Sequence, residues 1–219
     1  MNSQTTMTAT IISQDRASWS AVFALSLCVA TLVASEFMPV SLLTPIAADL
    51  HLTEGQGGQT IAVSGVFAVL TSLFISALTP GLDRRALLLW LTVLMLVSGL
   101  VTALAPNYAV LIAGRALVGV VIGGFWSLSA ATIMRLVPAA DVPRGLAILN
   151  GGNALATTIA APLGSFLGQY IGWRGAFFTV VPLAALTLIW LCLTLPAMPT
   201  MAGMKSPSPS VPWCCAGAR

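Results

Sequence analysis

Two charged residues of opposite sign, Glu36 and Arg115, stand inside long apolar stretches of this 219-residue chain. Arg115 follows Tyr108, where its apolar run begins, by seven residues, and Glu36 precedes Leu43, where its run ends, by seven. At helical rise each charge lies roughly 10 Å from the end of its run. An unpaired charge at that depth in a bilayer costs at least about 2.5 kcal/mol, so each residue needs a partner. We predict that Glu36 and Arg115 face each other.

The chemistry open to such a pair is proton binding. A low dielectric disfavours the charged form of a carboxyl group and a neighbouring arginine favours it, so a modest change in solvation can load or release a proton. Two alternatives stay open. Arg115 can be a structural cation whose side chain reaches toward the headgroups, and the pair can be a static ion pair that orients two helices.

Six apolar runs position these residues, each close to the roughly 20 residues that a helix needs to cross a bilayer. They cover residues 19–43, 59–78, 86–104, 108–128, 146–167 and 176–195. Hydrophobic residues make up 58% of the chain and charged residues 7%, against roughly 25% charged in soluble domains. The sequence therefore predicts an all-α integral membrane protein, a six-helix transmembrane bundle. Pro39 and Pro45 are expected to interrupt the first helix and to line a cavity.

Composition also excludes several classes of function. The nine Lys and Arg residues form no basic patch, so no nucleic-acid partner is expected. Neither Cys28 and Cys192 nor the adjacent Cys214 and Cys215 have metal-ligand or disulfide-framework spacing. The one histidine, His51, lies in a link between runs, where it cannot serve an intramembrane nucleophile. We expect no enzyme activity, no metal and no cofactor.

The distribution of basic residues predicts the orientation, because cytoplasmic links are enriched in Lys and Arg. With the amino terminus inside, only Arg174 lies outside, and seven basic residues are cytoplasmic: Arg16, Arg84, Arg85, Arg135, Arg144, Lys205 and Arg219. Both termini are then cytoplasmic. The expected organisation is a cytoplasmic tail over 1–18, the six-helix unit over 19–195, and a disordered, aberrant tail over 196–219.

Three motifs resemble those of the major facilitator superfamily. Gly81-Leu-Asp83-Arg84-Arg85 resembles its cytoplasmic loop motif, and Leu111, Arg115 and Gly119 resemble the fourth-helix motif of its proton-driven efflux members. The run Ala161-Pro162-Leu-Gly164-Ser-Phe-Leu-Gly168 is similar to its fifth-helix antiporter motif. The resemblance implies a latch of helix ends by Asp83, Arg84 and Arg85, and an antiporter motif carried by Pro162, Gly164 and Gly168.

Further stretches are similar to the purine ribonucleoside efflux pumps of bacteria. They include Glu36-Phe-Met-Pro39, Gly124-Phe-Trp126-Ser127 and Met134-Arg-Leu-Val-Pro138. Over residues 18 to 199 the resemblance implies the amino-terminal half, two inverted three-helix repeats, of a twelve-helix inner-membrane exporter. It implies proton-coupled antiport of purine ribonucleosides such as inosine or guanosine, driven by the proton gradient. The chain then reads as a truncated form, completed by a missing carboxy-terminal half or by a second copy in a homodimer.

Four polar or aromatic residues are candidates for a substrate cavity: Trp126, Ser127, Asn150 and Asn153. An aromatic face and amide or hydroxyl groups suit a nucleoside base and ribose, although packing alone is the simpler interpretation of each residue taken singly. The expected partners are the lipid bilayer, protons and a small polar solute. The alternatives are a non-transporting six-helix fragment, a regulatory or structural membrane protein, and sugar or drug efflux.

Overall fold

The structure is a computed structural model that describes residues 18–78 and 83–196. The tails predicted over 1–18 and 196–219 lie outside the described residues except for Ser18 and Pro196. Over the described ranges the chain is helical, with α2 at Trp19–Leu50, α3 at Glu54–Leu78, α4 at Arg84–Ala103, α5 at Tyr108–Leu136 and α6 at Val142–Thr194. A short 3-10 helix, η1, covers Ala139–Asp141. Five of these helices are long and apolar enough to cross a membrane.

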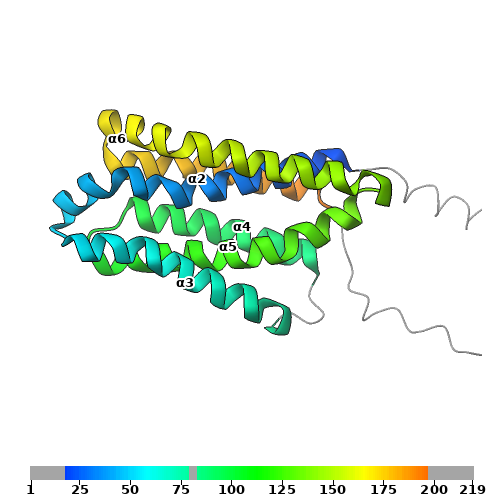
Figure 1. Cartoon of the computed structure of the whole chain (residues 1–219), viewed down its shortest axis with the longest axis horizontal. Helices are drawn as coiled ribbons and strands as arrows, with labels where there is room; N and C mark the ends of the chain where they lie inside the picture. The colour runs from blue at the N-terminus through cyan, green and yellow to red at the C-terminus, as the bar shows by residue number, and fades with distance from the viewer. Residues whose placement is uncertain (1–17, 79–82, 197–219) are drawn as a thin grey trace, which may run out of the picture.

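The last helix, α6, consists of two arms. Gly172 has φ 73° and ψ 166°, a backbone conformation that glycine adopts without strain and that no α-helix contains. The chain reverses there, and Figure 1 shows the second arm running back beside the first. Residues 142–171 and 173–194 are each longer than the roughly 20 residues that a crossing requires. With α2 to α5 these arms give the predicted six-helix bundle.

The first and last described turns meet at one end of the bundle. The indole Nε1 of Trp190, near the end of α6, donates a hydrogen bond of 3.1 Å to Ser20 Oγ, at the start of α2. Both described chain ends lie at this end in Figure 1. An even number of crossings returns the chain to its starting side, as this contact requires.

The helix α2 is longer and more continuous than the apolar run predicts. It extends to Leu50 and contains both Pro39 and Pro45, so the expected interruption is wrong. A proline removes its own N–H and the bond to the carbonyl four residues earlier, but neighbouring groups can satisfy that carbonyl and keep the helix intact. The apolar run ends at Leu43 because hydropathy marks the bilayer-facing part of a helix and not the end of its hydrogen bonds.

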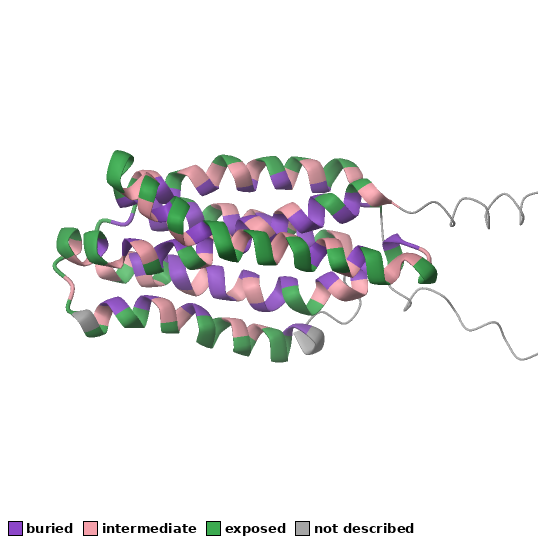
Figure 2. Ribbon diagram, turned by 45° about the horizontal axis from the view of Figure 1, so that its top comes forward, coloured by how far each residue is buried: buried purple, intermediate pink, exposed green. Residues whose placement is uncertain are grey.

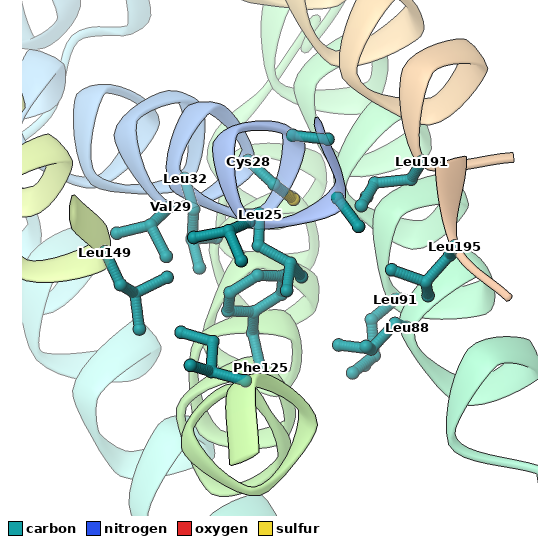
Figure 3. Close-up of a cluster of buried hydrophobic side chains, with 14 of the residues drawn as sticks. Leu25, Cys28, Val29, Leu32, Leu88, Leu91, Phe125, Leu149, Leu191 and Leu195 are labelled. Carbon is teal, nitrogen blue, oxygen red and sulfur yellow. The ribbon is translucent and has the colours of Figure 1, made fainter. Parts of the chain in front are cut away.

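The core lies where α2, α4, α5 and α6 meet. Figure 3 shows Leu25 and Leu32 of α2, Phe125 of α5 and Leu149 of α6 pointing toward one another. A smaller cluster at the other end of the bundle gathers around Phe177. In their apolar windows, 61% of α2 is buried but only 17% of α3. The helix α2 is therefore central, whereas α3 keeps a wide apolar face uncovered (Figure 2).

Glycines on α5 allow α3 to pack closely against it. A Cβ at Gly119 would lie 2.3 Å from the carbonyl oxygen of Ser64, and one at Gly123 would lie 2.2 Å from that of Ala68. These contacts involve backbone, which cannot rotate away. Close approach of this kind is how small residues join helices in membranes, and it brings α3 within hydrogen-bond reach of α5.

Replacing Gly123 with alanine should destabilise the protein, because the new methyl group pushes α3 away from α5. Overpacking of this kind typically costs about 1 to 3 kcal/mol. Gly151→Ala is the matched control, since a Cβ at this exposed helical position meets nothing within 4 Å. Alanine there should be neutral or stabilise by about 0.5 kcal/mol. Unfolding in mixed micelles measures both free energies, and equal effects would contradict the helix contact.

Candidate functional site

The structure confirms the predicted contact between Glu36 and Arg115. The Nη2 atom of Arg115 lies 2.8 Å from Oε2 of Glu36. The side chain of Arg115 is 1% exposed and that of Glu36 is 21% exposed. The arginine is thus enclosed by protein and does not reach toward the headgroups, whereas the side chain of Glu36 is partly exposed.

Arg115 binds acceptors on two neighbouring helices at once. Its Nε donates to the carbonyl oxygen of Thr60 on α3 at 3.1 Å, and its Nη1 donates to that of Ser35 on α2 at 3.1 Å. Its Nη2 donates to Glu36 Oε2 and, at 3.2 Å, to Ser64 Oγ. A planar guanidinium can direct donors to several acceptors in this way, and a lysine cannot. Arg115 therefore ties α2, α3 and α5 together.

Pro39 accounts for the availability of the Ser35 carbonyl oxygen. In a regular helix this oxygen would accept from the N–H of residue 39, but proline has none. Nη1 of Arg115 provides a donor instead. The proline that was expected to interrupt α2 thus leaves the helix intact and supplies an acceptor for the buried cation.

Ser64 is a site residue that the sequence did not reveal. As one of many small residues in its apolar run, it suggested only close helix contact. In the structure its Oγ lies 2.7 Å from Glu36 Oε1 and 3.2 Å from Nη2 of Arg115. It therefore contacts both members of the pair. The signal available in the sequence was its spacing from Thr60. The two polar residues are one turn apart and therefore lie on the same face of α3.

The arrangement places one ionisable carboxyl group, that of Glu36, against a permanent cation. The side chain of Glu36 is partly exposed, and its Oε2 contacts the guanidinium group of Arg115. Among the described residues, no group of three or more His, Cys, Asp or Glu side chains could hold a metal ion. Proton exchange at this carboxyl group stays a prediction.

The predicted substrate-cavity residues lie at another level of the bundle. Trp126 follows Arg115 by 11 residues on α5, which corresponds to roughly 16 Å along the helix. Its side chain is 37% exposed. The neighbouring Ser127 donates from Oγ to the Gly123 carbonyl oxygen at 2.7 Å. These two residues are therefore separated from the charge pair along α5.

The two asparagines belong to the first arm of α6. Asn150 is exposed and donates from Nδ2 to the Leu146 carbonyl oxygen at 2.9 Å, while Asn153 is half-buried. The turn between them faces Ser26 of α2, since a Cβ at Gly152 would lie 2.3 Å from its Oγ. Ser26 precedes Glu36 by ten residues, or roughly 15 Å. The asparagines and Trp126 are thus displaced from the charge pair in the same direction, toward the end where both described chain ends lie.

Comparison with known families decides the classification. Residues 22–213 match the Major Facilitator Superfamily. The chain belongs to this superfamily. Its helical bundle is similar to a bacterial homolog of the human lysosomal transporter Spinster in an inward-facing, unoccupied conformation, with a TM-score of 0.74 and 18% identity over 89% of this chain and 46% of that one. The proton:xylose symporter XylE gives a TM-score of 0.73 and 17% identity over 83% and 45%.

Two relatives of the chain are more similar in sequence. The transcription regulatory protein OpdE of Pseudomonas aeruginosa is 62% identical over 196 residues, which are 90% of this chain and 48% of that protein. The purine ribonucleoside efflux pump NepI of Salmonella paratyphi B is 46% identical over 184 residues, 84% of this chain and 46% of the pump. The chain spans about half the length of the relatives it matches, and its fold is the amino-terminal half of the superfamily fold.

The superfamily's loop motif is only partly within the described residues. Asp83 caps α4 by accepting from the backbone N–H of Arg85 at 3.0 Å. The guanidinium Nη2 of Arg85 donates to the Cys192 carbonyl oxygen, in the last turns of α6, at 3.0 Å. Arg84 is half-buried beside them. Asp83 therefore caps α4, and Arg85 connects the start of α4 with the end of α6. A latch function for all three residues stays a prediction.

The antiporter motif lies against α2. A Cβ at Gly164 would lie 2.7 Å from Ser41 Oγ, and one at Gly168 would lie 2.3 Å from Leu42 Cδ2. Pro162 lies inside α6, which stays helical around it. The glycines therefore allow the first arm of α6 to pack closely against the central helix, within one turn of Pro39. Their specific role in antiport stays a prediction.

A second polar cluster, at the bundle end opposite the described chain ends, was not predicted. Asp49, near the end of α2, forms an ion pair with Arg174 and accepts from Trp173 Nε1 at 3.1 Å. Arg174 also donates from Nη2 to the Ala105 carbonyl oxygen at 3.1 Å. Both charged side chains are more than two-fifths exposed, and ion pairs so exposed add little stability. The cluster joins the end of α2, the link between α4 and α5, and the start of the second arm of α6.

Arg115→Ala should destabilise the chain strongly, because it leaves Glu36 without its charged partner and removes a donor from three backbone carbonyl oxygens. Loss of one partner of a buried pair typically costs about 3 to 5 kcal/mol. Arg144→Ala removes the exposed pair with Asp141, 3.1 Å apart, and should change the free energy of unfolding by less than about 1 kcal/mol. Thermal unfolding in detergent compares the two variants, and a small loss for Arg115→Ala would show that its contacts are weak.

Proposed function

We propose that this chain forms half of a proton-coupled antiporter that exports small polar solutes across a bacterial inner membrane. The observation that carries the proposal is the ion pair between Glu36 and Arg115, in which the arginine is buried inside a membrane-spanning bundle and the side chain of Glu36 stays partly exposed. Membership of the superfamily and the name of the 46% identical relative support it. The proposed solutes are purine ribonucleosides such as inosine or guanosine.

Proton binding at Glu36 would change how firmly α2 is held to α5. The ionised carboxylate attracts the guanidinium of Arg115, and a proton removes that attraction. A ligand shifts the equilibrium between two arrangements of the bundle only to the extent that its free energy of binding differs between them. A proton that weakens one tie between helices supplies such a difference, so the proton gradient can drive the change of arrangement.

The substrate would bind at the level of Trp126 and Asn150. The half-exposed indole offers a face for a purine base, and the exposed amide offers both a donor and an acceptor for ring or ribose groups. Ser127 and Asn153 extend the same polar level. Since this level lies roughly 15 Å from Glu36 along the helices, the proton and the solute need not compete for one position, and α2 and α5 would transmit the coupling.

The proposed orientation places both described chain ends in the cytoplasm. The excess of basic residues on that side supports it, and the contact between Trp190 and Ser20 requires both ends to lie on one side. The wide uncovered face of α3 supports a complementary half, either a carboxy-terminal half or a second copy of the chain. That complement would close the cavity and complete the exporter.

The proposal predicts proton-driven nucleoside transport that depends on Glu36. Everted inner-membrane vesicles would contain the chain alone, or the chain with the carboxy-terminal half of the Salmonella pump. Radiolabelled inosine should accumulate under an inside-acid pH gradient only in the second case. Glu36→Gln should lower that accumulation at least about tenfold, because amide groups do not exchange protons at these pH values. Exchange of inosine without a gradient should persist.

Asp141→Asn is the control, because this carboxyl group is paired with Arg144 on the surface, away from the proposed site. It should transport as the unmodified chain does. Full gradient-driven accumulation by Glu36→Gln would contradict the proton role. Accumulation driven by the chain alone would show that no separate carboxy-terminal half is needed and would favour the homodimer.

The second candidate function is regulation, which the name of the 62% identical relative favours. The chain has no basic patch with which to hold DNA. An exporter can alter transcription without such contact, by lowering the cytoplasmic concentration of a solute that a soluble regulator detects. Regulation by this route depends on transport, whereas regulation through a protein partner does not.

A transcript comparison separates these routes. Cells that lack the gene would be complemented with the chain or with its Glu36→Gln variant, each together with the carboxy-terminal half of the Salmonella pump. If regulation depends on transport, Glu36→Gln should give the transcript profile of the deletion, since both lack proton-driven export. A profile matching that of the unmodified chain would instead assign regulation to a surface of the bundle and would remove transport as its cause.

A further inference from the structure

The hydroxyl group of Ser64 lies between three polar groups. Its Oγ is 2.7 Å from Glu36 Oε1, 2.8 Å from the Ile61 carbonyl oxygen and 3.2 Å from Nη2 of Arg115. Arg115 is a donor, and the other two groups are acceptors when Glu36 is ionised. The side chain of Ser64 is fully buried, so water cannot take the place of these partners.

A hydroxyl group has one hydrogen, so Ser64 can donate to only one of its two acceptors at a time. When Glu36 is ionised, its carboxylate is the stronger acceptor, because hydrogen bonds to charged groups are roughly twice as strong as neutral ones. The hydrogen then points to Oε1. The carbonyl oxygen of Ile61 is part of the helical backbone of α3 and is the alternative acceptor for the Ser64 hydroxyl group.

The geometry also distinguishes the two oxygens of Glu36. Oε2 accepts the 2.8 Å bond from Arg115, which leaves Oε1 as the oxygen beside Ser64. A proton on Oε2 would point at a cation, whereas a proton on Oε1 can point at a hydroxyl oxygen. The incoming proton should therefore bind Oε1.

We propose that Ser64 is the positioning residue that allows Glu36 to take up a proton without leaving a buried group unpaired. When a proton from the exposed side binds Oε1, the Ser64 hydroxyl group rotates, donates to the Ile61 carbonyl oxygen and accepts from the new O–H of Glu36. No covalent bond other than the new O–H forms or breaks. The heavy atoms keep their positions, and one rotation replaces one set of hydrogen bonds with another.

Arg115 keeps its place in both states because most of its acceptors carry no charge to lose. The carbonyl oxygens of Thr60, Ser35 and Glu36 accept from it at 3.1, 3.1 and 3.5 Å, and Ser64 Oγ accepts at 3.2 Å. The Ser35 carbonyl oxygen is free to do so because residue 39 is a proline. Proton binding therefore weakens the attraction between Glu36 on α2 and Arg115, while Arg115 keeps its hydrogen bonds to the uncharged acceptors.

Arg115 is the one charged side chain with a hydrogen bond to Glu36 among the described residues. From α3 the site receives Ser64 and the Thr60 carbonyl oxygen. The described charged residues of α4 lie in its first turn, and those of α6 lie at the start of its first arm and just after Gly172. Among the described residues, the side chains that bond to the Glu36 carboxyl group are thus those of Arg115 and Ser64.

This inference rests on the proposed function only in that Glu36 binds the proton, and it can be tested without transport. Dicyclohexylcarbodiimide modifies protonated carboxyl groups in apolar surroundings. Mass spectrometry of the complete chain in detergent micelles would give the fraction of Glu36 modified at each pH. Ser64→Ala should raise the pH of half-modification by about one unit, because the ionised form loses a charge-assisted bond and the neutral form loses a weaker one.

Ser72→Ala is the matched control on the same helix, because the hydrogen bond of the Ser72 hydroxyl group stays within α3, to the Val69 carbonyl oxygen 2.9 Å away. Neither Ser72→Ala nor Ser64→Thr, which retains a hydroxyl group, should move the midpoint. If Ser64→Ala leaves the midpoint unchanged, or if Ser64→Thr moves it as far as alanine does, the role of Ser64 is overturned. Absence of modification at every pH would instead overturn proton binding at Glu36, and with it the proposed function.

Discussion

The structure depends on satisfying one buried cation. Arg115 is 1% exposed, and an uncompensated charge so placed would cost several kcal/mol. Satisfying it requires acceptors from both sides of α5, and these come from α2 and α3. Close packing of α3 on the α5 glycines brings the Thr60 carbonyl oxygen within reach, and Pro39 releases that of Ser35. The close packing of α3 on α5 and the missing N–H of Pro39 thus both supply acceptors for the same buried charge.

Depth in the bilayer was the part of the site that the sequence could predict. Helical rise places Glu36 and Arg115 at matched levels without any knowledge of packing, and few other charges compete for them. The pairing follows from the cost of leaving either one alone. The apolar runs predicted the bundle for a related reason, because bilayer thickness sets the length of each crossing.

Rotation about each helix axis was the part that could not be predicted. Ser64 belongs to the site because of the face that α3 turns toward α5, and nearly every face of that helix carries small residues. Pro39 was taken as a break because its effect depends on whether another donor replaces its missing N–H. That donor, on Arg115, lies 80 positions from Ser35 in the sequence. The turn at Gly172 likewise depends on how the two arms of α6 pack, and glycine only permits it.

The separation between the charge pair and the predicted substrate level limits how coupling can work. Trp126 and Asn150 lie roughly 15 Å from Glu36 along their helices, so direct contact between solute and proton site is not the means. The two levels share α2, which contacts the asparagine-bearing turn through Ser26 and the arginine through the Ser35 carbonyl oxygen. A helix held at both levels can transmit a change at one to the other as a rigid element. Since α2 is also the most buried of the described helices, a shift of α2 must move its neighbours, and under the proposed function this is how one proton would change the arrangement of the bundle.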